Sequence, residues 1–215
     1  MRLILIRHGE SVDNVAGVYA GSRDSTLTSH GVVQAQCTAE HLAGKMAVHY
    51  VFSSNLQRAV RTAQAIVEEQ KRVHQFDGEL VQLASLREKD YGSLEGVRLD
   101  SPLRRRPDDS ETNKSMRSRV EEFVNQHLVP LLGVETPKQT FTCAVVAHGT
   151  ILNVLWHYLI DRTKQSRSNL LSASTHAARN PELPRGAVFW WNAGITDYRM
   201  RVMALHRPHH RMTFG

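Results

Sequence analysis

Cysteine is scarce in this sequence, with Cys37 and Cys143 as the only two among 215 residues. Two thiols cannot build the disulfide framework of a small secreted domain, and no Cys-x-x-Cys pair indicates a zinc site. We therefore interpret both cysteines as small buried hydrophobic residues of a protein in a reducing compartment.

Long apolar runs are also missing. The run near the N-terminus covers only Leu3 to Ile6, whereas a membrane-spanning helix needs roughly 18 or more apolar residues. A run of this length is also too short for the core of a secretory signal peptide. We expect a soluble, cytoplasmic protein that does not bind a membrane.

The charge balance is basic, with 27 Lys and Arg against 21 Asp and Glu and a formal net charge of +6. Such an excess favours anionic partners, and it leaves phosphorylated metabolites and phosphoproteins open. The dense basic run Arg104-Arg105-Arg106 is short and has no interleaved aromatic residue. We therefore predict no nucleic-acid partner.

Short apolar runs that end in turns alternate with stretches of helical periodicity. Strands are predicted at 3–6, 50–53, 80–86 and 143–147, and helices at 32–45, at 115–131 and around the apolar faces that contain Ile66 and Leu155. This alternation is typical of an α/β domain, in which helices flank a mostly parallel central sheet.

We expect one domain over residues 1–215. Two polar segments, 97–114 and 161–185, are predicted to be loop insertions, the second near the mouth of the expected pocket. The last apolar runs are predicted to be edge strands, and they cover 187–192, 195–200 and 202–205.

Two predicted strands end in the same dipeptide. His8-Gly9 and His148-Gly149 each follow an apolar run directly, and Arg58 begins the helix that follows a third strand. In an open parallel sheet, ligands bind at the carboxyl ends of the strands, so these residues can converge although they are far apart in the sequence. The pattern predicts one shared functional site.

The residue types at these ends favour an anion over a metal ion. A zinc site needs a third protein ligand, no His-Glu-x-x-His motif is present, and Arg7 beside His8 would repel a cation. Guanidinium groups such as those of Arg7 and Arg58 match phosphate oxygens in pairs. They also hold the pKa of a nearby imidazole down, and a neutral imidazole is a nucleophile. We predict no metal site.

At this point five ordered motifs resemble the histidine phosphatase superfamily, which includes cofactor-dependent phosphoglycerate mutases and many small-molecule phosphatases. The motifs are Arg7-His8-Gly9-Glu10-Ser11 with Asn14, Asp24 to Thr28 with Gly31, Ser53 to Ala59 with Thr62, Leu86-Arg87-Glu88 with Tyr91-Gly92 and Glu95-Gly96, and Val146-Ala147-His148-Gly149. The resemblance extends over nearly the whole chain. It implies the three-layer, phosphoglycerate mutase-like fold.

The resemblance also implies roles for these residues. His8 would attack phosphorus and carry the phosphoryl group, and Glu88 would protonate the leaving oxygen and later deprotonate water. The groups that hold the phosphoryl oxygens would be Arg7, Arg58 and His148. The substrate-binding residues implied are Arg7, Asn14, Ala20, Gly21, Arg58, Glu88 and Gly149. No cofactor and no metal are implied.

Within this family, a metal-independent phosphatase that acts on a small phosphate ester is favoured over a mutase. The segment between Gly96 and Ser115 is short, and the run 104–107 echoes the mutase pattern only in part. A low-activity scaffold is a third reading, but a scaffold could lose catalytic groups that this chain retains. Many relatives form dimers, so a homodimer is left open.

Overall fold

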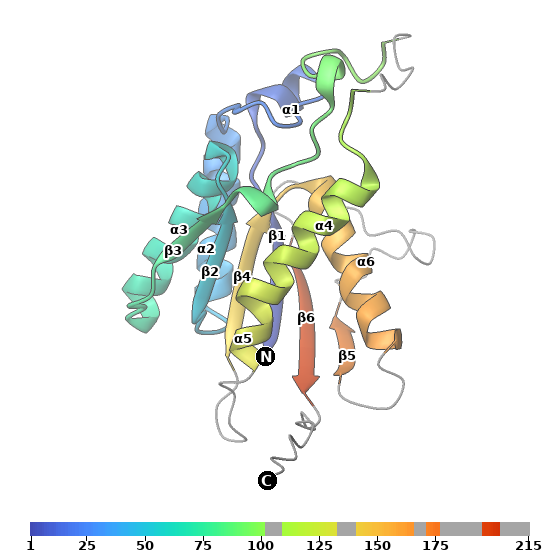
Figure 1. The fold of residues 1–215 in the computed structure, drawn as a ribbon. Helices are drawn as coiled ribbons and strands as arrows, with labels where there is room; N and C mark the ends of the chain where they lie inside the picture. Colours follow the sequence, from blue (N-terminus) through green and yellow to red (C-terminus); the bar gives the residue numbers. More distant parts are fainter. Residues whose placement is uncertain (102–108, 133–140, 166–170, 177–194, 203–215) are drawn as a thin grey trace, which may run out of the picture.

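The structure is a computed structural model that describes residues 1–101, 109–132, 141–165, 171–176 and 195–202, with side chains up to residue 162. Its described strands form one six-stranded sheet with the order β3-β2-β4-β1-β6-β5 (Figure 1). The strands are β1 (Arg2–Arg7), β2 (Tyr50–Ser54), β3 (Leu80–Leu83), β4 (Thr142–Ala147), β5 (Leu171–His176) and β6 (Ile195–Val202). The first four are mutually parallel, and β6 is antiparallel to both of its neighbours.

Helices cover both faces of the sheet, with α2 and α3 on one side and α4 and α6 on the other (Figure 1). The helices are α1 (Val12–Ala16), α2 (Ser29–Ala43), α3 (Gln57–His74), α4 (Asn113–Phe123), α5 (Val129–Leu132) and α6 (Gly149–Gln165). The predicted α/β fold with a mostly parallel sheet in three layers is confirmed.

Strand β1 shows why both faces are covered. Leu3 and Leu5 pack into the core beneath α4 and α6, whereas Ile4 and Ile6 pack into the core beneath α2 and α3. Successive side chains of a strand point to opposite faces, so an unbroken apolar run needs an apolar partner on each side. All six residues of β4 are buried for the same reason.

The C-terminal part of the sheet differs from the prediction. The segment 161–185 is not simply a loop, because α6 continues to Gln165 and β5 occupies Leu171–His176. β6 is a single strand, Ile195–Val202, and it lies between β1 and β5, so its prediction as an edge strand is wrong. The predicted strand at 187–192 lies outside the described residues, as does 203–205.

Smaller differences concern element ends and burial. β3 stops at Leu83 and is followed by a short 3₁₀ turn, Ala84–Leu86, while the predicted helix 115–131 begins at Asn113. Between α4 and α5 this helical segment passes through a π-helical turn, Val124–Leu128. Cys143 is buried as predicted, but Cys37 is exposed because it lies on the outer face of α2.

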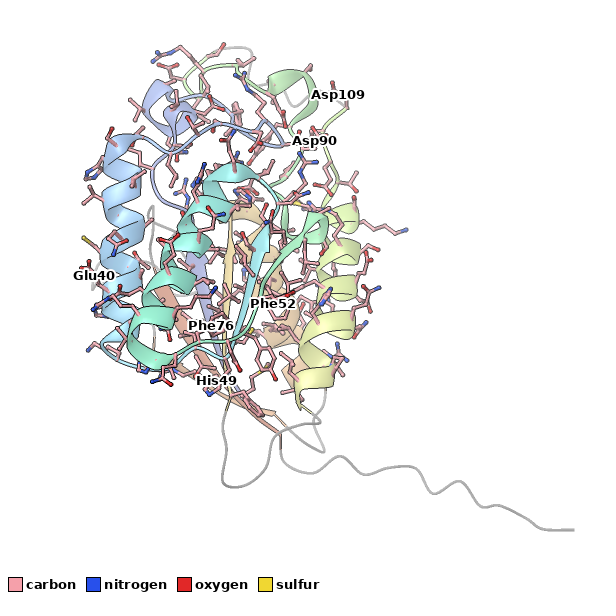
Figure 2. All side chains as sticks on the ribbon, turned by 90° about the vertical axis from the view of Figure 1, so that its left-hand side faces the viewer. Glu40, His49, Phe52, Phe76, Asp90 and Asp109 are labelled. Atoms are coloured by element: carbon pink, nitrogen blue, oxygen red, sulfur yellow. The ribbon has the colours of Figure 1, made fainter. Side chains whose placement is uncertain are left out.

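The loops that follow the parallel strands gather at one end of the molecule. Figure 2 shows His49, which precedes β2, at the lower end, and Asp90 and Asp109 at the upper end. The carboxyl ends of β1, β2 and β4 therefore open toward the upper end, where ligands of such sheets bind.

Among the described helices, none is long and apolar enough to cross a membrane.

Candidate active site

A cavity of about 420 Å³ lies where the parallel strands end. Eight of the nine predicted site residues line it, and they are Arg7, His8, Asn14, Ala20, Gly21, Arg58, Glu88 and Gly149. The ninth, His148, is fully buried, and its ring centroid lies 5.0 Å from that of His8. The fold thus brings together all the residues that the sequence patterns singled out.

His8 is buried, and its hydrogen bonds define its tautomer. Its Nδ1 lies 2.6 Å from the Gly9 carbonyl oxygen, which can only accept, so Nδ1 carries the hydrogen. The Nε of Arg58 donates to His8 Nε2 at 3.3 Å, so Nε2 carries a lone pair. An imidazole held in this way presents Nε2 as its nucleophilic atom.

The surroundings of His8 keep this imidazole neutral. Burial lowers its pKa well below the usual value, and the positive charges of Arg58 and Arg7 lower it further. The sequence predicted the effect of the arginines, but burial is the larger cause. The backbone hydrogen bond to Gly9 acts in the opposite direction without cancelling these effects.

At pH 6.5 we expect His8 to be neutral, with hydrogen on Nδ1 only, whereas a histidine free in water is about half protonated there. Because the pKa of His8 is lowered, the ring takes up a second proton only when the pH falls well below 6.5. Ring ¹⁵N chemical shifts measured between pH 8 and 5 check this, with the signal assigned by its loss in His8→Gln. A midpoint at or above pH 6.5 would contradict the expectation.

Among the residues whose side chains are described, Arg58 is the largest that is fully buried, with a relative exposure of 1%. Besides its contact with His8, its two terminal nitrogens donate to backbone carbonyls, to Arg23 at 2.6 Å and to Gly21 at 2.8 Å. Burial lowers its pKa, and the nearby carboxylate of Glu88 opposes that shift. The loop around residues 21–23 therefore orients the guanidinium group that contacts His8.

Glu95 holds this loop in place. Its carboxylate accepts hydrogen bonds from the backbone N–H of Ser22 at 2.6 Å, the Ser22 hydroxyl at 3.1 Å and the N–H of Tyr91 at 3.2 Å. Gly21 has a φ of +52°, and a Cβ there would lie 2.1 Å from Glu95 Oε1. Only glycine permits both this conformation and this contact. Glu95 is thus a positioning residue for Arg58.

Replacing Glu95 by Ala is expected to lower kcat/KM for the predicted phosphate-ester hydrolysis by about 10- to 100-fold, because a small displacement of an oriented group is costly in rate. Alanine removes the acceptor of the Ser22 and Tyr91 N–H groups and thereby loosens the loop. The measurement is steady-state kinetics, with Glu121→Ala at an exposed residue of α4 as the control. A Glu95→Ala value within twofold of wild type would refute the positioning role.

Glu88 lies against the first turn of α6. Its carboxylate accepts hydrogen bonds from the N–H of Thr150 at 3.0 Å, of Ile151 at 3.1 Å and of Lys89 at 2.8 Å. A helix N-terminus favours such a carboxylate through its free N–H groups and its dipole. The loop that carries Glu88 is in this way fixed to the start of α6, directly after β4. Glu88 lines the same cavity as His8.

Within the described part of the chain, one ring nitrogen of His148 has no hydrogen-bond partner. Its Nε2 lies 2.8 Å from the Ser54 hydroxyl, which also accepts from the N–H of Leu56. Its Nδ1 is buried and has no hydrogen-bond partner among the described residues. Burial lowers the pKa of His148, and the neighbouring His8 and Arg58 lower it further, so this ring is neutral as well.

The first loop owes its shape to close packing. Asn14 is held by a capping box, in which its side chain accepts from Ser11 N–H at 3.0 Å and Ser11 Oγ accepts from Asn14 N–H. A Cβ on Gly9 would lie 2.3 Å from the carbonyl oxygen of Gly31. Gly9 is therefore required by its close contact with α2.

Six further residues line the cavity that were not predicted as site residues, namely Val18, Tyr19, Tyr91, Leu99, Thr150 and Asn153. Thr150 and Asn153 are three positions apart on α6 and share one helical face, a spacing that could have indicated them. Tyr91 lies in the motif of Glu88. Among the described residues, no group of three or more His, Cys, Asp or Glu side chains could hold a metal ion.

Comparison with known proteins shows the family of this chain. The family model of the histidine phosphatase superfamily (branch 1) matches residues 3–178. The chain belongs to the histidine phosphatase superfamily. Sequence relatives of this superfamily member include a 2,3-bisphosphoglycerate-dependent phosphoglycerate mutase of Bartonella bacilliformis, 30% identical over 71% of this chain and 78% of the relative. A Schizosaccharomyces pombe protein named as a probable phosphatase is 30% identical over 72% of this chain and 71% of that protein.

Solved structures show the same fold. A mycobacterial glucosyl-3-phosphoglycerate phosphatase superposes with a TM-score of 0.71 at 21% identity and covers 93% of this chain and 96% of that one. The alpha-ribazole phosphatase of Shigella flexneri has a TM-score of 0.59 at 27% identity, over 74% of this chain and 80% of that one. The relatives of this chain therefore include both proteins named as phosphatases and proteins named as mutases.

Proposed function

We propose that this superfamily member is a metal-independent phosphomonoester hydrolase that works through a phosphohistidine at His8. The observation that carries the proposal is the state of His8, whose Nε2 accepts a hydrogen bond from the Nε–H of Arg58 and which lines a cavity shared with Glu88. A neutral nucleophile between cations, with a carboxyl group beside it, suits phosphoryl transfer.

The proposed reaction has two steps. His8 Nε2 attacks phosphorus, the bond from phosphorus to the ester oxygen breaks, and the protonated Glu88 carboxyl gives its proton to that oxygen. Water then attacks the phosphohistidine, Glu88 takes a proton from the water, and the phosphorus–nitrogen bond breaks. Inorganic phosphate is released, and both side chains return to their starting states.

The positive groups of the cavity would hold the phosphoryl oxygens. Arg7 and Arg58 supply charge, and the Asn14 amide supplies a hydrogen bond. If the Ser54 hydroxyl donates to His148 Nε2, then His148 Nδ1 carries the hydrogen and is a buried donor without a protein acceptor in the described residues. A phosphoryl oxygen would satisfy it.

The names of the relatives support a phosphatase, with a phosphoglycerate mutase as the alternative. The two structural relatives are named as phosphatases, and the one from Shigella flexneri is 27% identical to this chain over the aligned residues. The Bartonella relative is named as a mutase at 30% identity, so phosphoglycerate mutation is the second candidate. Each activity needs the same phosphohistidine, but a mutase returns the phosphoryl group to a second hydroxyl.

The test is release of inorganic phosphate from a panel of phosphomonoesters in the presence of EDTA. We expect turnover of several esters and a phosphoenzyme that survives an alkaline quench and is lost in acid, as a phosphoramidate is. Conversion of 3-phosphoglycerate in the presence of its bisphosphate, without net phosphate release, would favour the mutase. Absence of both reactions, with folded protein, would refute the enzymatic proposal.

A further inference from the structure

The lining of the cavity contains two chemically different sets of side chains. One set is ionic or polar and includes Arg7 and Arg58. The other set is apolar or aromatic and consists of Val18, Tyr19, Tyr91 and Leu99, which together are called the apolar wall. A phosphate dianion will lie against the arginines because its charge is compensated there. The apolar wall is then available for contact with the rest of the ester.

The backbone beneath the apolar wall is held by hydrogen bonds between two loops. Tyr19 N–H donates to the Val97 carbonyl at 2.9 Å, Gly96 N–H donates to the Tyr19 carbonyl at 2.8 Å, and Leu99 N–H donates to the Gly17 carbonyl at 2.8 Å. Val18 and Arg98 form an antiparallel bridge between the same loops. The wall is therefore preformed, which lowers the entropic cost of binding a ligand.

The two aromatic side chains of the wall support each other. The rings of Tyr19 and Tyr91 are in tilted contact at a centroid distance of 4.9 Å, and the Tyr91 hydroxyl lies 3.1 Å from the Thr150 hydroxyl. The Lys89 ammonium group lies 5.4 Å from the centroid of the Tyr91 ring. Because these contacts fix Tyr91 on the side of Glu88, the aromatic surface stands next to the proposed proton donor.

Part of the apolar wall is exposed to solvent. Leu99 is 47% exposed although its backbone is fixed, and on nearby α1 Val12 and Val15 are 51% and 67% exposed. Single exposed apolar residues need no explanation, but an apolar side of a concave site that also holds convergent polar groups is the usual form of a ligand pocket. A ligand with an apolar face would remove Leu99 from water.

We propose that the preferred substrate is a phosphomonoester whose leaving group has an apolar or aromatic face, and that this face packs against the apolar wall. The inference rests on the proposed phosphatase function and specifies its substrate class. It sets this chain apart from an enzyme for small polyhydroxylated or carboxylated esters, whose leaving groups would leave the wall in contact with water or with mismatched polar groups.

The test compares two esters that both lose a primary alkoxide, 2-phenylethyl phosphate and glycerol 1-phosphate, so that leaving-group chemistry is similar. We expect kcat/KM to be at least about 10-fold higher for 2-phenylethyl phosphate, the range in which hydrophobic pockets discriminate. In Leu99→Ser the ratio of the two kcat/KM values should fall several-fold toward one. In Val73→Ser it should stay at the wild-type value.

Val73 is a suitable control because it is also exposed, at 43%, and lies near the end of α3. Arg58, on the first turn of the same helix, is about 22 Å away along the axis. Both variants therefore remove an exposed apolar side chain, but only Leu99→Ser changes the cavity. Hydrolysis of both esters with a ratio of one or below would overturn the inference and leave the proposed function standing.

A binding experiment separates failure of the inference from failure of the reaction. The phosphonates 3-phenylpropylphosphonate and 3,4-dihydroxybutylphosphonate resemble the two esters but cannot be hydrolysed at the bridging atom. Calorimetric titration should give at least a several-fold lower Kd for the phenyl compound, and Leu99→Ser should narrow the difference. Equal Kd values would overturn the inference, whether or not the esters turn over.

Discussion

Replacement of His8 by Gln is expected to lower kcat for phosphomonoester hydrolysis by about 10⁴-fold or more, which corresponds to roughly 5 kcal/mol of lost transition-state stabilisation. Glutamine is similar in size to histidine but has no lone pair that can form the phosphoenzyme. The amide oxygen of glutamine can replace His8 Nε2 as an acceptor for the buried Arg58, which also keeps its acceptors at Gly21 and Arg23. The measurements are phosphate release and trapping of labelled phosphoenzyme.

A matched control for this prediction is His157→Gln, since His157 lies on the exposed side of α6. It should retain the wild-type rate and the wild-type phosphoenzyme signal. Thermal unfolding of both variants shows whether the loss in His8→Gln comes from unfolding. If folded His8→Gln retained more than a few per cent of the activity, or if a phosphoenzyme still formed, the nucleophile would have to be another residue.

Replacement of Glu88 by Gln is expected to have an effect that depends on the leaving group. For an alkyl ester, kcat/KM should fall by about 10³-fold, because the departing alkoxide needs a proton and a positioned acid contributes about 10² to 10⁴ in rate. For 4-nitrophenyl phosphate the fall should be less than about 10-fold, since the phenolate leaves without protonation.

The comparison of the two esters distinguishes proton donation from positioning. Glu88 also accepts hydrogen bonds from Thr150, Ile151 and Lys89, and a loss of those contacts would slow both esters alike. Glu121→Gln, on the exposed side of α4, is the control for the substitution itself. Equal losses for the two esters would show that Glu88 supports the site without donating the proton.

Much of the fold could be predicted because its signals are local. The apolar runs before His8 and His148 predicted the central strands β1 and β4, since a strand covered on both faces needs apolar side chains throughout. The C-terminal region was predicted less well. β5 carries the polar sequence Leu171–His176, which reads as a loop, and its pairing with β6 is a contact between distant segments.

The sequence by itself singled out the proposed reacting groups of this protein. His8 and His148 each follow a central strand, and the family motifs identify Arg58 and Glu88, because residue type and position beside a strand end are features of the chain alone. Such features also explain why the cavity contains every predicted substrate-binding residue.

Only the tertiary structure decided how these groups are oriented and what surrounds them. The tautomer of His8 depends on the carbonyl of Gly9 and on Arg58, and the orientation of Arg58 depends on a loop that Glu95 holds. The apolar wall depends on the pairing of the loops that carry Tyr19 and Leu99. Loop paths and hydrogen bonds between distant residues leave no periodic pattern in a sequence, because they are determined by packing after the strands and helices have come together.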